Sequence, residues 1–361
     1  MKCSRCVMDD TVPGITIDAD GICNLCHQHD HMSAAHPIGG FRHIAERMGK
    51  KCIVGLSGGK DSSYTLYLMK EVYGLNPIAV TFDNGWSTQT ATRNIEAMTE
   101  ALGVPRITVK TNCAASDDTM KAFIRAGLPD VEAVTDISFI AGLYNVASTF
   151  GIKNIVLGSS FRTEGITPHG MFYFDAKYVD DVHKKHGDRP DESVSMLWLR
   201  PWLKWMVVDK IKRFNPLYYE DYDNEAAKDF LHDEFGWTWY GGHHRENIIT
   251  EWNNNYWLYH KFGTDLREVE YSALIRSHQM DRDQALDLLR RPPDVAQDTI
   301  ETVCKRLGMT IEEHNYCVAS QPGDRSQYTT YRPTFRALRP LFWSLARMNM
   351  VPWSFYDKYC R

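Results

Sequence analysis

The chain has 361 residues, of which 43% are hydrophobic and 24% charged, and its formal net charge is −5. These values exclude an intrinsically disordered or fibrous protein, and a chain of this length has room for two domains and a large core. Because acidic residues outnumber basic ones by 46 to 41, no overall positive surface points to nucleic acid as the obligatory partner.

The sequence also shows no membrane-directing segment. No stretch approaches the roughly 20 uninterrupted apolar residues that a membrane-spanning helix needs. The first residues, Met1 to Cys6, lack the apolar core of a signal peptide. We therefore expect a cytoplasmic protein that has no membrane partner.

Four of the nine cysteines lie in the first 26 residues as two CxxC pairs, Cys3, Cys6, Cys23 and Cys26. This is the spacing of a zinc ribbon, because each CxxC turn brings two sulfurs to one metal and the segment between the pairs can form a hairpin. An iron–sulfur cluster is the alternative, and His27 or His29 could replace one cysteine. Four thiolates leave no open coordination position, so we expect a structural metal.

From about residue 51 to 165, short apolar runs alternate with segments whose apolar residues have helical spacing. Strands are expected at 52–56, 78–82, 106–109 and 154–157, and helices at 61–73, 90–102 and 137–150. This alternation is typical of an α/β protein with a doubly wound parallel sheet. Beyond residue 200 we expect helices near 207–214, 223–235, 247–262, 281–290 and 295–307.

The first expected strand runs directly into the sequence Ser57-Gly-Gly-Lys-Asp-Ser-Ser63. Two glycines permit a tight turn with converging backbone N–H groups, and the following helix directs its positive dipole end toward that turn. We therefore expect phosphate to bind here, with hydroxyl groups from the serines, a positive charge from Lys60 and a Mg²⁺-holding carboxylate from Asp61. A Walker A loop would need serine or threonine at position 61.

This loop resembles the SGGxDS loop of the ATP pyrophosphatase, or PP-loop, superfamily. The resemblance implies an adenine nucleotide alpha hydrolase-like fold, in which the loop holds the pyrophosphate of ATP while AMP is transferred to a carbonyl or amide oxygen. It implies that Lys60 and Asp61 are catalytic. The ATP-binding residues that it implies in the loop are Ser57, Gly58, Gly59, Lys60, Asp61, Ser62 and Ser63.

Two further loops follow strands at the edge of the sheet where nucleotides bind. Asp83 follows the second strand, and similar positions in the superfamily contact adenosine. In the loop after the last strand, Gly158 allows close backbone approach, Arg162 could pair with a phosphate, and Glu164 with a metal or an attacking amine. We add these four residues to the expected ATP site.

The C-terminal half contains Glu234-Phe-Gly-Trp-Thr-Trp-Tyr-Gly-Gly-His-His-Arg-Glu246, in which a Gly-Gly turn presents two histidines, an arginine and a glutamate. Together with the CxxC segment and the Ser57–Ser63 loop, this block resembles the N-acetyl sugar amidotransferases over residues 1 to about 295. These bacterial enzymes convert a sugar acetamido group to an acetamidino group during the synthesis of surface polysaccharide, such as the O-antigen of lipopolysaccharide, or flagellin glycan.

The resemblance implies two catalytic residues in this block. His244 would bind the substrate or a phosphate, and Glu246 would orient a hydroxyl group or an incoming amine. His243 stands where the family pattern has a lysine, so the anionic group of the substrate is left open.

We thus expect a zinc-ribbon knuckle at 1–36, a PP-loop ATP-binding domain at 37–205 and a helical substrate or partner region at 206–361. The implied reaction uses ATP and Mg²⁺ to adenylate the acetamido oxygen of a nucleotide-linked N-acetyl sugar, after which ammonia displaces AMP. Separate glutaminase and ammonia-channelling proteins would supply the ammonia, and Zn²⁺ would be structural.

A PP-loop enzyme that thiolates tRNA is the alternative, although such enzymes commonly carry a further cysteine pair. The remaining cysteines form no CxxC: Cys52, Cys113, Cys304, Cys317 and Cys360. A third possibility is a zinc-ribbon protein that senses ATP without turnover. The last forty residues combine aromatic residues with arginines and are expected to pack on the body: Arg325, Arg332, Arg336, Arg339, Arg347 and Arg361.

Overall fold

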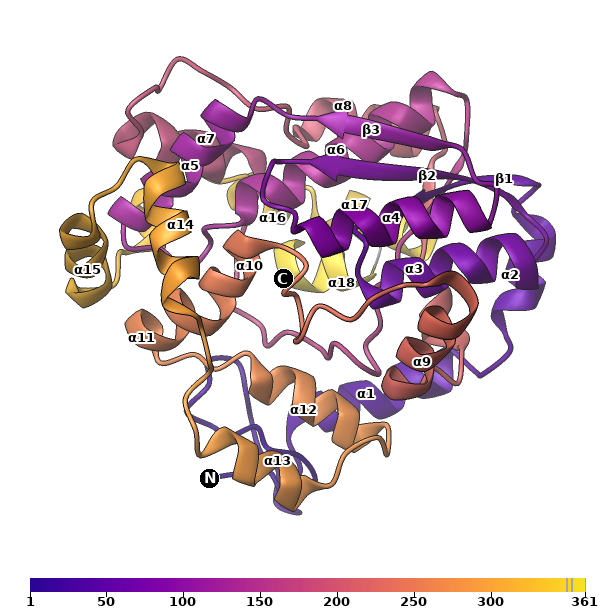
Figure 1. Ribbon diagram of the computed structural model, residues 1–361, viewed down its shortest axis with the longest axis horizontal. Helices are drawn as coiled ribbons and strands as arrows, with labels where there is room; N and C mark the ends of the chain where they lie inside the picture. The colour runs from indigo at the N-terminus through magenta and orange to yellow at the C-terminus, as the bar shows by residue number, and fades with distance from the viewer. Residues whose placement is uncertain (349, 352, 361) are drawn as a thin grey trace.

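A computed structural model describes residues 1–348, 350–351 and 353–360, so Arg361 lies outside the described residues. A parallel sheet of five strands runs through the molecule in the order β3-β2-β1-β4-β5 (Figure 1). The strands are β1 (Lys51–Gly55), β2 (Asn76–Asp83), β3 (Arg106–Lys110), β4 (Asn154–Val156) and β5 (Lys212–Phe214). The predicted α/β class and the four predicted strands are confirmed.

Helices cover both faces of this sheet, as the doubly wound prediction requires. Cys52 and Val54 of β1 belong to one buried cluster with residues of α3 (Lys60–Tyr67) and α4 (Gln89–Ala101). Ile53, which points the other way because strand side chains alternate, belongs to a second cluster with residues of the helices that follow β3 and β4. Those helices are α5 (Cys113–Arg125), α6 (Ala133–Thr149) and α7 (Ala176–His186).

The C-terminal part is mainly helical, as expected. Its α-helices are α8 (Leu199–Leu203), α9 (Asn224–Phe235), α10 (Ile248–Trp252), α11 (Leu258–Phe262), α12 (Arg267–Arg276), α13 (Arg282–Leu289), α14 (Gln297–Leu307), α15 (Ile311–Ala319), α16 (Arg332–Ala337), α17 (Arg339–Arg347) and α18 (Trp353–Phe355). Other helical turns are η1 (Leu68–Val72), η2 (Lys204–Val208), η3 (Pro216–Tyr219), η4 (Asn253–Trp257), η5 (Arg325–Gln327) and η6 (Tyr356–Cys360).

The helix that we expected at 207–214 is wrong. The helical turn η2 ends at Val208, and Lys212–Phe214 form the edge strand β5, which pairs in parallel with β4. Val207 and Val208 are 43% and 68% exposed, so the apolar spacing that suggested a helix does not mark a buried face. Pairing with a strand more than fifty residues away is a tertiary effect that local periodicity does not report.

The N-terminal segment folds back onto the C-terminal half of the chain. After the cysteine pairs come α1 (Asn24–Ala35) and α2 (Phe41–Arg47). Met8 and Leu25 share a buried cluster with the four cysteines and with Val269 of α12, and Figure 1 shows this segment beside α12 and α13. Among the described residues, no helix is both long and apolar enough to cross a membrane.

Candidate active site and metal centre

The loop Ser57–Ser63 joins β1 to α3 at the carboxyl edge of the sheet. Gly58 has a φ of +83°, and a Cβ built there would lie 2.3 Å from the carbonyl oxygen of Ala91, so a side chain is excluded. The backbone N–H of Gly59 donates to Ser57 Oγ at 3.2 Å, and Ser62 Oγ donates to the carbonyl oxygen of Gly59 at 3.0 Å. The loop is therefore a pre-formed turn at a helix N-terminus, which suits an anion.

Gly158, from the loop after β4, lies directly against this turn. A Cβ at Gly158 would lie 2.7 Å from the backbone nitrogen of Ser62 and 2.8 Å from the carbonyl carbon of Asp61. Glycine is therefore required here for close approach of two backbones, and it leaves the first turn of α3 uncovered by any side chain at this position. The two loops that sequence analysis assigned to ATP are thus in contact.

Residues after α9 brace the loop from its outer side. Trp237 Nε1 donates to the carbonyl oxygen of Gly58 at 3.0 Å, and Asn94 Nδ2 donates to the same oxygen at 3.2 Å. The backbone N–H of Lys60 donates to the hydroxyl oxygen of Tyr240 at 3.4 Å. The FGW segment therefore fixes the loop, a role that the sequence could not show because the two parts lie far apart in the chain.

Asp61 and Lys60 are held by the segment between η3 and α9. Tyr222 donates its hydroxyl proton to Asp61 Oδ1 at 2.6 Å, and Lys60 Nζ donates to Asn224 Oδ1. Lys60 Nζ also lies 3.2 Å from Asp61 Oδ1, and the Lys60 residue is only 4% exposed. The Asp61 carboxylate is thus fixed beside the anion-binding turn, where it can hold Mg²⁺ on a phosphate.

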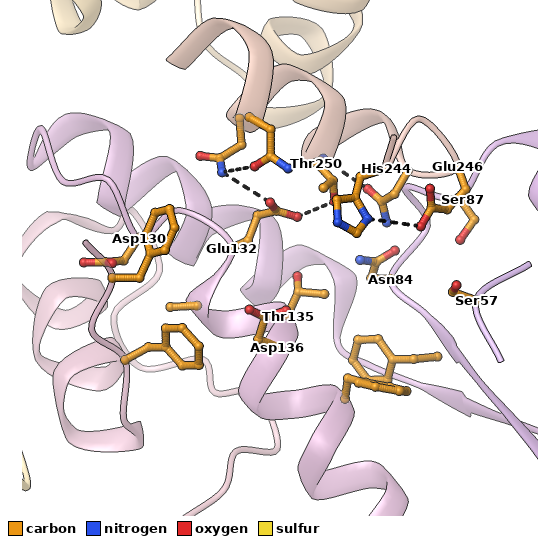
Figure 2. Close-up of a pocket in the computed structure, with 18 of the residues that line it drawn as sticks. Ser57, Asn84, Ser87, Asp130, Glu132, Thr135, Asp136, His244, Glu246 and Thr250 are labelled. Atoms are coloured by element: carbon orange, nitrogen blue, oxygen red, sulfur yellow. Dashed lines mark hydrogen bonds and ion pairs between the residues drawn. The ribbon is translucent and has the colours of Figure 1, made fainter. Parts of the chain in front are cut away.

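A cavity of about 390 Å³ opens from the loop at Leu56 and Ser57 (Figure 2). Its floor comes from the ends of β1 and β2 and the start of α6, and its opposite wall comes from the segment His244–Asn254. Polar and acidic side chains are numerous in it: Asn84, Ser87, Asp130, Glu132, Thr135, Asp136, His244, Glu246, Asn247, Thr250, Asn253 and Asn254. Phe172 and Phe174 also line it.

His244 and Glu246, both expected to be catalytic, lie in the wall of this cavity. His244 Nδ1 is 3.6 Å from Glu246 Oε1, and a Cβ at Gly59 would lie 3.2 Å from the same carboxylate oxygen, so Glu246 also faces the loop. Burial alone would lower the pKa of His244, but Glu246, Glu164 and Glu132 raise it to about 10. His244 is thus a cation at neutral pH, positioned to interact with a phosphate.

The neighbouring His243 has the opposite character. Its ring centroid is 3.8 Å from that of His244, and its Nδ1 is 3.7 Å from Glu270 Oε1 of α12. Burial lowers the pKa of His243 well below its usual value, and the His244 charge lowers it further. The pair therefore places one neutral and one protonated imidazole side by side.

Two expected ATP ligands have their side chains elsewhere. Asp83 is exposed and accepts from the backbone N–H of Gly85 at 3.0 Å, whereas the next residue, Asn84, lines the cavity. Arg162 donates to Ser33 Oγ at 3.2 Å and to the carbonyl oxygen of His36 at 3.3 Å, so its guanidinium faces α1. Contact of these two residues with ATP stays a prediction.

Glu164, the last expected ligand, lies near Asp61 and His244. Its Oε2 accepts from the backbone N–H of Ser160 at 3.1 Å. Burial raises the pKa of Glu164 to about 7, and the Asp61 carboxylate acts in the same direction. Sequence analysis missed Glu132, Thr135, Asp136 and Asn253, because no local motif marks residues that only the fold brings to one cavity.

The four cysteines of the knuckle converge as predicted. All four are buried, and one ligand atom from each lies within 4.8 Å of the others. The Sγ atoms of Cys3 and Cys26 are 3.8 Å apart, those of Cys6 and Cys23 3.7 Å, and those of Cys23 and Cys26 3.6 Å. The arrangement could hold one metal ion on four sulfur ligands. Neither expected histidine alternative joins it, since His27 pairs with Asp18 and His29 contacts Ser277.

A buried arginine from the C-terminal half completes the metal centre. Arg276, the last residue of α12, is 3% exposed, and its Nε and Nη2 donate to the Sγ atoms of Cys26 at 3.2 Å and Cys6 at 3.3 Å. A guanidinium in this position compensates the negative charge of a thiolate-bound metal, as the outer contacts of metal sites commonly do. Arg282 adds hydrogen bonds to the carbonyl oxygens of Cys3 and Cys6, both at 3.0 Å.

Two residues that follow Arg276 connect the four-cysteine centre to the segments around the phosphate loop. Ser277 Oγ donates to the carbonyl oxygen of Arg162 at 2.8 Å. Gln279 Nε2 donates to the carbonyl oxygen of Tyr222 at 2.8 Å, and its Oε1 accepts from the backbone N–H of Asn224 at 3.0 Å. Gln279 thus holds the two residues that bind Asp61 and Lys60.

Comparison with known families agrees with this geometry in both halves of the cavity. Residues 41–178 match the NAD synthase family. Residues 246–341 match the family described as LPS biosynthesis protein WbpG-like, C-terminal domain. A parallel sheet with the Ser57–Ser63 turn and an NAD synthase match makes this a PP-loop ATP pyrophosphatase-type protein. Together the two matches support an N-acetyl sugar amidotransferase-like member of that superfamily.

Individual relatives are distant. An uncharacterized protein of Methanocaldococcus jannaschii is 26% identical over 166 residues, which cover 44% of this chain and only 58% of that protein. A predicted tRNA methyltransferase subunit from the same organism has 15% identity and a TM-score of 0.28, covering 50% of this chain and 73% of its own. The U34-tRNA thiolase NcsA from Methanococcus maripaludis, with its [4Fe-4S] cluster, has 15% identity and a TM-score of 0.31. The match covers 85% of this chain and 95% of the thiolase chain. At these scores neither structure bears on function.

Proposed function

We propose that the protein is an ATP-dependent, AMP-forming amidotransferase that converts the acetamido group of an N-acetyl sugar to an acetamidino group. The observation that carries this proposal is the shared cavity. Ser57 and Glu132 come from the region that matches NAD synthase, and Glu246 and Asn253 come from the WbpG-like region, yet all four line one cavity. The ATP-handling part and the part linked to polysaccharide synthesis thus face a common space.

In the proposed reaction the amide oxygen of the sugar attacks the α-phosphorus of ATP, and pyrophosphate leaves toward the Ser57–Ser63 turn. The N-terminal end of α3, which follows the turn, and the His244 imidazolium would stabilise negative charge on the phosphates. Asp61 would hold Mg²⁺, which neutralises phosphate charge when bound. Ammonia then displaces AMP from the activated carbon, and exclusion of water matters because water would restore the amide.

The physiological setting belongs to the same proposal. The sugar would be nucleotide-linked, and the reaction would run in the cytoplasm as a step in O-antigen or flagellin glycan synthesis. A separate glutaminase and an ammonia-channelling protein would deliver the ammonia. In an assay, ammonium replaces both.

We propose zinc for the four-cysteine site. With a Zn–S bond of about 2.3 Å, the sulfurs of a tetrahedral site are separated by about 3.8 Å. The three Sγ–Sγ distances of 3.6, 3.7 and 3.8 Å match a single ion, whereas an iron–sulfur cube holds each thiolate on a different iron and separates them further. Metal analysis of the purified protein should give one zinc per chain; iron with sulfide would contradict this assignment.

The function is tested by incubating the protein with ATP, Mg²⁺, ammonium and a panel of nucleotide-linked N-acetyl sugars. We expect AMP, pyrophosphate and a sugar whose mass shows replacement of one oxygen by NH. Asp61→Ala should lose AMP formation while keeping its circular dichroism spectrum. AMP formation that requires tRNA and a sulfur donor, instead of a sugar, would refute the proposal in favour of tRNA thiolation.

A further inference from the structure

The far part of the cavity is acidic although the substrates for adenylation are neutral or negative. Of the described residues that line it, Asp130, Glu132, Asp136 and Glu246 carry carboxylates, His244 is the basic one, and there is no lysine or arginine. Asp130 is neutralised by Arg325, whose Nε lies 2.8 Å from Asp130 Oδ2, and Glu246 pairs with His244. Glu132 and Asp136 are thus the carboxylates left without a cationic partner at ion-pair distance among the described residues.

These two carboxylates form a built site on one helix face. Glu132 is the N-cap residue of α6, and the backbone N–H of Asp136 donates to its carbonyl oxygen at 3.0 Å, so the two side chains are one helical turn apart and face the same way. Thr250 donates its hydroxyl proton to Glu132 Oε1, and Asn253 Nδ2 donates to Glu132 Oε2 at 3.3 Å. Figure 2 shows Glu132 central in the cavity, between Thr250 and Asp136.

A second observation points to a ligand at this place. Asn253 is only 4% exposed and lines the cavity, yet its Oδ1 has no hydrogen-bond partner, and the same holds for the buried hydroxyl of Thr135. Buried polar atoms without partners are costly, so each calls for a bound group. The free oxygens of Asn253 and Thr135 are hydrogen-bond acceptors, and they lie in the same cavity as the carboxylates of Glu132 and Asp136. Such a set of acceptors fits a small cation that donates several N–H hydrogen bonds.

We propose that Glu132 and Asp136 bind the ammonium ion that supplies nitrogen, accept its proton, and then bind the amidinium group of the product. This inference rests on the proposed amidotransferase function and identifies where its second half-reaction occurs. Both ligands are nitrogen cations, unlike the neutral acetamido substrate. The planar amidinium presents paired N–H donors to a carboxylate in the same way as a guanidinium.

The proton balance of the reaction requires such a base. An amide, ATP and uncharged ammonia give an amidinium ion, AMP and pyrophosphate with no net proton released. With ammonium as the nitrogen source, one proton must therefore leave the nitrogen before its lone pair can attack the activated carbon. Adenylation releases the acetamido N–H proton, which leaves with pyrophosphate as its monoprotonated form. As the C–N bond then forms and the C–O bond to AMP breaks, one of the three ammonia hydrogens moves to the sugar nitrogen, so this second step needs no further base.

Titration of the pair supports this role. Burial raises the pKa of Glu132 to about 7, and the neighbouring Asp136 carboxylate acts in the same direction. The His244 cation acts the other way. A carboxylate with a pKa near the working pH is suited to accept a proton and release it again within one turnover.

The first experiment compares two steps in Glu132→Gln and Asp136→Asn with an exposed control on α4, Glu96→Gln. Adenylation is followed by exchange of labelled pyrophosphate into ATP in the presence of the sugar, and amidination by ammonium-dependent AMP release. We expect the two cavity variants to lose amidination far more than exchange, with the KM for ammonium raised about tenfold or more, which corresponds to ~1.4 kcal/mol. The Glu96→Gln enzyme should match the wild type in both.

Hydroxylamine provides a sharper discrimination, because it is uncharged at neutral pH and needs no deprotonation before it attacks. With hydroxylamine, the Glu132→Gln enzyme should form the hydroxyamidine product at a rate much closer to that of the wild type than it reaches with ammonium. If ammonium and hydroxylamine are affected equally, or if the KM for ammonium is unchanged in both variants, the inference is wrong.

A binding measurement separates this inference from the proposed function. Acetamidinium chloride is titrated into the protein by NMR, with acetamide as the neutral control of the same shape. We expect acetamidinium to bind the wild type more tightly than acetamide, and this preference to be lost in Glu132→Gln. Absence of sugar-dependent exchange in the wild type would refute the amidotransferase proposal, whereas equal binding of the two probes would refute the cation site.

Discussion

Replacement of Arg276 by methionine tests whether the metal centre depends on the C-terminal half of the chain. The guanidinium makes two N–H···S bonds, at 3.2 Å to Cys26 and 3.3 Å to Cys6. A hydrogen bond to a charged group contributes about 1.5–3 kcal/mol, so losing both costs roughly 3–6 kcal/mol. Removal of one partner from a buried ion pair costs about 3–5 kcal/mol, which agrees with the value obtained from the two hydrogen bonds. Methionine keeps the volume and the apolar stem, so packing changes little.

Two assays read this perturbation. Chemical unfolding of the metal-loaded protein should show the free energy of unfolding reduced by about 3 kcal/mol or more. Competition with a chromogenic chelator should show metal affinity reduced by about 10–100-fold, the usual effect of losing an outer contact of a metal site. Arg290→Met is the matched control, because the Arg290 side chain is 79% exposed and, among the described residues, forms an ion pair with the neighbouring Asp287 alone. If Arg276→Met resembles Arg290→Met in both assays, the guanidinium does not stabilise the thiolates.

Three other predictions concern the cavity and its supports. Gln279→Leu should weaken the binding of Mg²⁺–ATP in isothermal titration calorimetry, whereas Gln297→Leu, at an exposed position, should leave it unchanged. The effects of Gln279→Leu and Tyr222→Phe should not add, because Gln279 holds Tyr222 and Tyr222 holds Asp61; additive effects would contradict this connection. Glu246→Gln should lower the pKa of His244 from about 10 toward its usual value, as measured by NMR of the ring. A raised pKa stabilises the fold fully below pH 6.5, and this gain is lost as pH rises through 10; the variant should therefore be less stable than the wild type by the most near pH 6, and the difference should shrink toward zero by pH 10. Burial raises the pKa of Glu132 to about 7, so ionisation of this carboxyl lowers the free energy of unfolding as pH rises from 4.5 through 7. Glu132→Gln should therefore raise the melting temperature more at pH 8 than at pH 4.5. A change in melting temperature that is the same at both pH values would contradict the raised pKa.

The parts of the site that the sequence predicted are those encoded by contiguous residues. The turn at Ser57–Ser63 and the two CxxC pairs each place their ligands within one local bend, so spacing alone defines them. Gly158 was also expected at this edge, because the carboxyl ends of parallel strands share an edge, and it lies against the turn; its contact with ATP stays a prediction.

Residues whose side chains lie away from the cavity, and residues that were missed, depend on longer-range geometry. The Asp83 side chain is exposed, whereas the next residue, Asn84, lines the cavity. Arg162 turns to α1, whose position beside the loop is set by docking of the knuckle and has no local signal. Glu132 and Asn253 are 121 positions apart, and neither belongs to a recognisable motif.

The π-helical turn η4 between α10 and α11 fixes the length of this part of the chain. Trp252 and Trp257 are five positions apart, yet both are fully buried and stack with ring centroids 5.6 Å apart. In an ordinary α-helix, residues five apart point about 140° away from each other. The wider turn lets both indoles share the core while Asn253 and Asn254 face the cavity.

Deleting one residue from η4 would return the segment to α-helical register, and one indole or one amide would have to leave its place. We therefore expect that this stretch cannot shorten or lengthen by a single residue without displacing either a core indole or a cavity amide. Length itself is the constrained property here, more than the identity of any one side chain.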